Sequence, residues 1–155
     1  MPERVFFPRD EYFMRLALRE AGRALEHDDV PVGCVIAAAG EVVAAAGNER
    51  ELRSDPTAHA EVLALREASR QLGGWRLDGA ALYVTLEPCA MCAGAIVLAR
   101  IQRVVYGTTD PKAGAAGSVI DVLAEPRFNH RPEVAGGLLA GEAGQMLRAF
   151  FAKRR

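Results

Sequence analysis

The chain has 155 residues, enough to bury one sizeable hydrophobic core, and we expect residues 1–155 to form a single domain. Hydrophobic residues make up 50% of the sequence and charged residues 25%, which is ordinary for a soluble globular protein. The net charge of −1 gives no compositional signal for nucleic acid, although a local basic patch such as Lys153-Arg154-Arg155 can still bind RNA.

The sequence contains no candidate membrane segment or targeting segment. The longest nearly apolar stretch, residues 30–39, is too short to cross a bilayer. The N-terminal residues Met1-Pro2-Glu3-Arg4 lack the apolar run of a signal peptide. The three cysteines are an odd number and two of them share one motif, so a disulfide framework is not expected. We therefore expect a cytoplasmic protein without a membrane partner.

Hydrophobic periodicity and turn residues predict an alternation of helices and strands. In chain order, the sequence predicts a helix over 10–27 with Asp10 as its N-cap, strands over 33–39 and 42–46, a helix over 56–72, a strand over 81–86, a helix over 88–99, a strand over 103–106, a Gly-rich loop over 110–117, a short helix near 119–123, a short strand near 134 and a closing amphipathic helix over 141–155. Strands that alternate with helices indicate an α/β layered fold with a mixed sheet.

Two short strings of residues are typical of one zinc site, namely His59-Ala60-Glu61 and Pro88-Cys89-Ala90-Met91-Cys92. Histidine and cysteine are zinc ligands by type, and the Cys-x-x-Cys spacing lets two thiolates from one helical turn share a metal. Three protein ligands leave a fourth position open for water, which is typical of a catalytic site. The sequence therefore predicts one Zn²⁺ per chain, bound by His59, Cys89 and Cys92.

Glu61 lies two residues after His59 and is the candidate proton donor and acceptor for water at the metal. A lone Cys-x-x-Cys is also found in structural zinc knuckles and redox pairs, and a lone His-x-Glu carries almost no information. The two strings together, in this order and with proline before the first cysteine, favour a catalytic zinc site and resemble the signature of the zinc-dependent nucleobase deaminases.

Longer stretches of the chain extend this match. They are residues 30–33, 57–61, 82–95, 103–107, 112–118, 128–131 and 150–151. Over nearly its whole length the chain resembles the bacterial tRNA-specific adenosine deaminases, which are cytidine deaminase-like zinc enzymes. The resemblance implies a three-layer α-β-α fold with a central mixed five-stranded sheet. It also implies a homodimer that acts on a tRNA anticodon stem-loop and converts the wobble adenosine to inosine by hydrolytic deamination.

The resemblance also implies which residues hold the substrate. Asn48 matches the residue that hydrogen-bonds the flipped base, and Asp110 matches a residue near the sugar of the target nucleotide. Leu86 and Glu87 are expected to shape the pocket through their backbone, and Val30 to contact the substrate. On sequence alone, the alternative for Asn48 is a turn residue at a strand end, and the alternative for Asp110 is a turn or helix cap.

Two other functions remain open at this point. A related deaminase that acts on a free base or nucleoside, such as cytosine, guanine or adenine, would use the same zinc chemistry. The loop over 110–118 and the basic tail favour RNA, because a small substrate needs neither. A zinc-stabilised binding module without turnover is the third possibility, but a structural zinc site has no use for the acid Glu61 beside its ligands.

Overall fold

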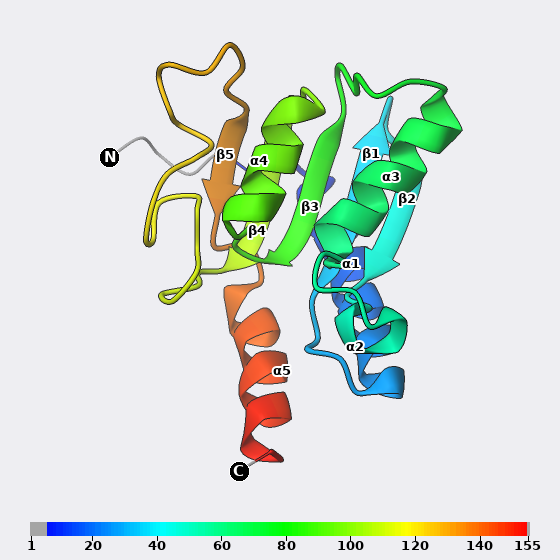
Figure 1. Cartoon of the computed structure of the whole chain (residues 1–155), viewed down its shortest axis with the longest axis vertical. Coiled ribbons are helices and arrows are strands. Elements are labelled where there is room, and N and C mark those ends of the chain that lie inside the picture. The colour runs from blue at the N-terminus through cyan, green and yellow to red at the C-terminus, as the bar shows by residue number, and fades with distance from the viewer. Residues whose placement is uncertain (1–5, 155) are drawn as a thin grey trace.

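The computed structural model describes residues 6–154, in which a five-stranded mixed sheet lies between two layers of helices (Figure 1). Its elements in chain order are α1 (Asp10–Ala24), the short 3-10 helix η1 (Leu25–His27), β1 (Gly33–Ala38), β2 (Glu41–Gly47), α2 (Arg50–Arg53), α3 (Ala60–Leu72), β3 (Ala81–Leu86), α4 (Ala90–Leu98), β4 (Arg103–Thr108), β5 (Glu133–Gly136) and α5 (Ala140–Ala152). The predicted fold class is confirmed. The expectation of one domain over the whole chain stays a prediction.

The strand order β2-β1-β3-β4-β5 decides which loops meet. β1 pairs antiparallel with β2 and β3, whereas β3, β4 and β5 run parallel to one another. The start of β1, the end of β2 and the carboxyl ends of β3 and β4 therefore share one edge of the sheet. Loops at the carboxyl ends of parallel strands are the usual place for a ligand in open α/β sheets.

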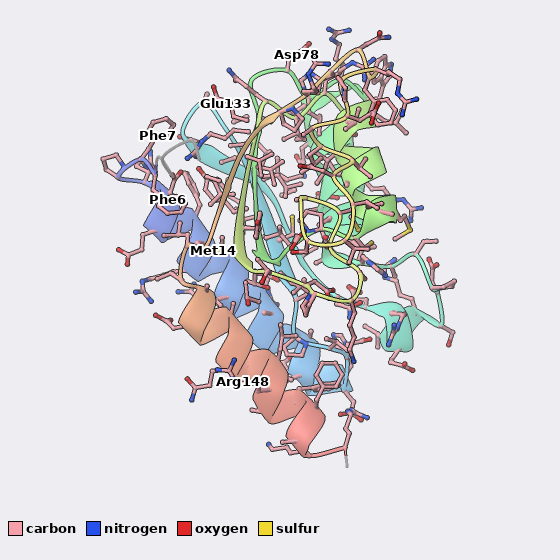
Figure 2. The ribbon with its side chains drawn as sticks, turned by 90° about the vertical axis from the view of Figure 1, so that its left-hand side faces the viewer. Phe6, Phe7, Met14, Asp78, Glu133 and Arg148 are labelled. Atoms are coloured by element: carbon pink, nitrogen blue, oxygen red, sulfur yellow. The ribbon has the colours of Figure 1, made fainter. Side chains whose placement is uncertain are left out.

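Successive side chains along a buried strand point to opposite layers of helices. Cys34 and Ile36 of β1 belong to the cluster of buried residues that includes α3 and α4, whereas Val35 belongs to the cluster that includes α1. This alternation is the period of two expected of a strand buried on both faces. Figure 2 shows α1 and α5 on one side of the sheet, where Met14 of α1 is fully buried, and α3 and α4 on the other.

One predicted helix begins later than expected and another is absent. The helix predicted over 56–72 begins only at Ala60, because residues 56–58 form a turn fixed by hydrogen bonds from the Thr57 backbone and hydroxyl to Asp55. The short helix predicted near 119–123 is absent, and this part of the described chain consists of turns with an isolated bridge between Ala116 and Asp121. Val119 and Ile120 are 54% and 50% exposed there, and Leu123 at the end of the segment is the residue that is buried in the core.

Other predictions were confirmed in outline. The hairpin, the strand over β3, the helix over α4 and the closing helix all appear, although α5 ends at Ala152 and Arg155 lies outside the described residues. Asp10 is not an N-cap, because its buried carboxylate pairs with Arg103 at 2.7 Å. The short helix α2 was not predicted. Within residues 6–154, no helix combines the length and the apolar character that crossing a membrane requires.

Candidate active site and metal centre

The loops at the shared edge of the sheet enclose a cavity of about 130 Å³. Its lining residues are Val30, Val32, Asn48, Arg50, His59, Ala60, Glu61, Leu86, Glu87, Cys89 and Asp110. The cavity is smaller than the roughly 300–1,000 Å³ pockets that hold drug-sized ligands, so it suits one small ring. All the residues predicted for the site except Cys92 therefore line this cavity. Cys92 does not line the cavity and is fully buried in the first turn of α4, near His59.

Three potential metal ligands converge beside this cavity. His59 Nδ1 lies 3.7 Å from Cys89 Sγ and 3.5 Å from Cys92 Sγ, and the three ligand atoms all lie within 4.8 Å of one another. A tetrahedral zinc ion, with Zn–S bonds of about 2.3 Å and a Zn–N bond of about 2.0 Å, requires N···S separations of roughly 3.6 Å. The side chains therefore fit the ligand set of a zinc ion.

The backbone around the ligands favours negative charge on sulfur. His59 and Cys89 have extended backbones and occupy the N-cap positions of α3 and α4, where helix N-termini carry partial positive charge. A hydrogen bond from Cys92, together with His59, lowers the pKa of the Cys89 thiol to about 4. Hydrogen bonding to Cys89 and burial raise the pKa of Cys92. Binding of a metal cation therefore has to displace the Cys92 proton.

Glu61 is the buried acid of the site. It lies in the first turn of α3, two residues after His59, and is only 4% exposed. Burial raises the pKa of its carboxyl from the ordinary value to about 7. A carboxyl group with a pKa near neutral can both accept and return a proton, which is the property that general acid–base catalysis needs.

Asn48 follows β2 and is held at both ends of its amide. Its Nδ2 donates to the Val30 carbonyl at 3.1 Å, and its Oδ1 accepts from the Arg50 backbone N–H at 3.1 Å. The second contact is the turn role that the sequence left open, and Asn48 also lines the cavity at 8% exposure. Asp110 likewise has both a turn role and a place in the cavity. Its Oδ1 accepts hydrogen bonds from the backbone N–H groups of Lys112 and Ala113, and the residue lines the cavity.

Sequence reasoning missed the contributions of two buried carboxylates. Glu87 was expected to act through its backbone, but its side chain binds the loop that follows β4. Asp29 is fully buried and accepts hydrogen bonds from the first backbone N–H groups of α2, at 2.6 Å from Glu51 and 3.2 Å from Leu52. Asp29 thereby fixes the helix that carries Arg50 to the cavity. No sequence pattern predicts either contact, because both join segments more than 20 residues apart.

Comparisons with known proteins agree with this geometry. The MafB19-like deaminase family matches residues 9–155. The tRNA-specific adenosine deaminase of Bacillus subtilis (strain 168) is 51% identical over 147 residues, which cover 95% of this chain and 91% of the relative. A solved structure from a study of A-to-I editing by tRNA:A34 deaminases at the wobble position of transfer RNA has a TM-score of 0.85 at 48% identity, covering 88% of this chain and 99% of that one.

A more distant solved structure, of guanine deaminase from Nitrosomonas europaea, is 23% identical with a TM-score of 0.69 and covers 98% of this chain and 88% of that one. At this level of identity the likeness shows a shared fold alone. The fold is therefore common to proteins that act on different purines, and the choice of substrate has to be argued from the site.

Proposed function

The chain belongs to the MafB19-like deaminase family and groups there with tRNA-specific adenosine deaminases, and from this premise we propose that it deaminates adenosine to inosine at the wobble position of a tRNA anticodon. The observation that carries the proposal is that His59, Cys89, Glu61 and Asn48 all line the same small cavity. A cavity of this size accepts the base alone, so the nucleotide has to be extruded from its stack for its base to react.

We propose that the metal is zinc, with one ion per chain held by His59, Cys89 and Cys92. The N···S separations and the two thiols support zinc over harder cations. Bound there, zinc supplies a Lewis acid that activates water for attack on the base. Metal analysis of the purified protein tests the assignment, and a Cys89→Ala, Cys92→Ala double variant that still holds one zinc per chain would contradict it.

We propose that Glu61 carries the protons of the reaction. It takes a proton from the attacking water as oxygen bonds to C6 of adenine, and it passes that proton to the neighbouring ring nitrogen. It then takes the second proton of the former water and delivers it to the amino nitrogen, so the C6–N bond breaks and ammonia leaves. Support comes from the full burial of Glu61 within reach of the metal ligands.

The remaining lining residues are proposed to hold the substrate. The Asn48 amide offers a donor and an acceptor to the edge of the purine ring, and the apolar side chains of Val30 and Leu86 contact the base. Asp110 is proposed to accept a hydrogen bond from a hydroxyl of the sugar. Such a contact would favour a nucleoside or RNA over a free base, which has no sugar to bind.

A homodimer is proposed for the assembly. An apolar groove between α3 and α4, lined by Trp75 and Leu98 among others, supports it, since Trp75 is 64% and Leu98 70% exposed. Light scattering should return twice the chain mass at micromolar concentration, and a monomer mass would contradict the proposal. A cytoplasmic location is proposed as well, supported by three free cysteines that a reducing compartment preserves.

Ammonia and inosine release from a tRNA anticodon stem-loop, compared with free adenosine, cytidine and guanine, tests the function. We expect turnover of the stem-loop that Glu61→Gln abolishes, and little turnover of the free compounds. Turnover of a free base or nucleoside with an unreactive stem-loop would instead assign the chain to small-molecule deamination. Zinc binding without turnover of any of the four compounds would indicate a binding module.

A further inference from the structure

The segment from Asp110 to Ser118 is built around the side chain of Glu87. Glu87 is 2% exposed, and its Oε1 accepts a hydrogen bond from the Asp110 backbone N–H at 3.1 Å. Its Oε2 accepts from the backbone N–H groups of Ala116 at 2.9 Å and Ser118 at 3.1 Å. The Ser118 hydroxyl donates a further short hydrogen bond to Oε1. One buried carboxylate thus satisfies three backbone donors in a segment that consists mainly of turns.

The loop also lies directly against this carboxylate. A Cβ atom added to Gly114 would lie 2.4 Å from Cδ of Glu87 and 2.6 Å from the Asp110 carbonyl oxygen. Next to it, the Ala115 backbone N–H donates to the Pro88 carbonyl at 2.8 Å. The loop is therefore attached to the two residues that immediately precede the metal-binding turn at the start of α4.

We propose that Glu87 is a positioning residue for substrate binding: its carboxylate holds the loop over 110–118 so that Asp110 faces the cavity. The inference rests on the proposed function, since it assigns Asp110 a substrate to hold. The backbone N–H of Asp110 is itself one of the four donors to Glu87, so a shift of the carboxylate moves Asp110 directly. Both residues line the same cavity.

Glu87→Gln tests the positioning role at nearly constant side-chain volume. One of the two oxygens becomes an amide nitrogen that cannot accept. Depending on how the amide turns, either the Asp110 backbone N–H or the backbone N–H groups of Ala116 and Ser118 lose their acceptor, whereas the Ser118 hydroxyl can bond either atom. We expect kcat/KM on a tRNA anticodon stem-loop to fall by about tenfold to a hundredfold, mainly through KM, with zinc fully retained. Glu142→Gln on the surface of α5 is the matched control and should leave kcat/KM unchanged.

Gly114→Ala displaces the same loop without altering the carboxylate, and we expect it to reproduce the rise in KM. Ser118→Ala removes one hydrogen bond from an exposed position, where the fold is not at risk, and should give a smaller rise of up to about tenfold. If Glu87→Gln fails to fold, these two variants decide the question: unchanged KM in both overturns the proposal.

A double-mutant cycle separates positioning from a purely structural role. Asp110→Ala keeps the backbone N–H that binds Glu87 but removes the side chain that Glu87 is proposed to aim. The loss caused by Glu87→Gln should therefore shrink several-fold in the Asp110→Ala background. Equal losses in both backgrounds, or a loss of zinc, would show that Glu87 only stabilises the metal-binding turn.

Hydrogen exchange distinguishes a failure of this proposal from a failure of the proposed function. In Glu87→Gln, the amides of Asp110, Ala116 and Ser118 should exchange faster than in wild type, and this readout needs no substrate. If wild type does not deaminate the stem-loop, the proposed function fails, but the exchange data still test whether the Glu87 carboxylate holds the loop. Active wild type with unchanged exchange and unchanged KM in Glu87→Gln overturns the positioning role itself.

Discussion

At the scale of single residues, the chemistry of the site depends on whether hydrogen bonds offset the cost of burying each carboxylate. Burial raises the pKa of Glu61 to about 7. Burial alone would also raise the pKa of Glu87, but hydrogen bonds from Ser118, Asp110 and Ala116 outweigh it and hold that pKa below its ordinary value. The first environment suits a group that exchanges protons, and the second suits a group that stays charged and holds a loop.

Replacing Glu61 by glutamine should abolish turnover while the fold and the zinc remain. The amide keeps the shape of the side chain but cannot accept a proton, and a positioned acid–base group contributes about 100- to 10,000-fold to the rate. Single-turnover rates on the stem-loop, with zinc content measured on the same samples, check this. A near-normal rate at full zinc would show that another group moves the protons.

Residue chemistry was predictable wherever it depends on type and spacing along the chain. The convergence of His59, Cys89 and Cys92 was predictable in this way, because histidine and a Cys-x-x-Cys pair are zinc ligands by type and spacing. The role of the Glu87 side chain was not predictable, because its backbone donors lie 23 to 31 residues away in a loop without periodicity.

At the scale of elements, α3 and α4 begin just after His59 and Cys89 rather than before them. His59 and Cys89 keep extended backbones, and α3 and α4 start at Ala60 and Ala90. Apolar periodicity predicted these helices and the strands between them, because burial against the sheet repeats with the element. It could not locate their first residues, which are fixed by hydrogen bonds in the preceding turns, and it wrongly predicted the helix near 119–123.

The close approach of α1 to β1 makes Gly33 a sensitive position. A Cβ there would lie 1.9 Å from the Ala17 carbonyl oxygen and 2.5 Å from the Ala21 backbone nitrogen. Gly33→Ala should therefore lower the free energy of unfolding by about 1–3 kcal/mol or more, because α1 has to move off the sheet. Urea unfolding measures this, with Gly74→Ala, which has no neighbouring atom within 4 Å, as the control. Equal stability of the two variants would refute the tight packing.

A buried ion pair joins α1 to β4. The Asp10 carboxylate accepts hydrogen bonds from Arg103 at 2.7 and 2.8 Å and from the Tyr83 hydroxyl at 2.8 Å. Burial alone raises the pKa of Asp10, but hydrogen bonds from Arg103, the Phe7 backbone and Tyr83 outweigh it, so the net pKa lies below its usual value. The pair therefore stabilises the fold only while Asp10 is ionised.

Asp10→Asn should cost about 3–5 kcal/mol of unfolding free energy at neutral pH, because it leaves the Arg103 charge buried without its partner. The stabilisation in wild type is fully present above the unfolded pKa of about 3.9 and is lost as the pH falls through the lower, folded value. The stability difference between the two proteins should therefore narrow below about pH 4. Urea unfolding of wild type and Asp10→Asn across this pH range measures the difference. Any pH dependence that arises at the cysteine and histidine site is common to both proteins and cancels in the difference. A difference that stays constant down to acid pH would contradict the role of the ionised pair.

At the scale of the whole molecule, the strand order gathers the site from distant parts of the chain. Because β1 runs antiparallel to β3, the loop before β1 meets the loops after β2, β3 and β4 at one edge. Sequence pattern alone predicted the alternation of elements but not this order, which follows from long-range pairing. Periodicity predicted the five strands, whereas their arrangement as one central sheet between two helical layers was predictable only through the family resemblance.

The carboxyl end of α5 lies at the end of the molecule where the site loops gather, beyond the end of the sheet (Figure 1). Phe150 is 9% exposed and holds the end of α5, whereas Phe151 is 49% exposed. The Arg154 guanidinium lies 4.3 Å from the Phe150 ring centroid and forms an ion pair with Asp28. The charge of Arg154 is thus already matched by Asp28 within the protein.

Truncation after Ala152 tests whether the tail binds the RNA backbone. Each phosphate neutralised on single-stranded nucleic acid contributes roughly 0.7 to the log–log salt slope of binding. Loss of three cations would flatten the slope by about 2 units, but pairing of Arg154 with Asp28 reduces the expected change to about 1.4.

The control is Arg76→Gln, which removes a cation paired with Asp78 at the opposite end of the molecule (Figure 2) and should leave the slope unchanged. Binding of the stem-loop at several salt concentrations measures both variants. An unchanged slope after truncation would make the tail an ordinary solvated terminus and leave Arg50, Arg53, Arg127 and Arg131 as the candidates for phosphate contacts.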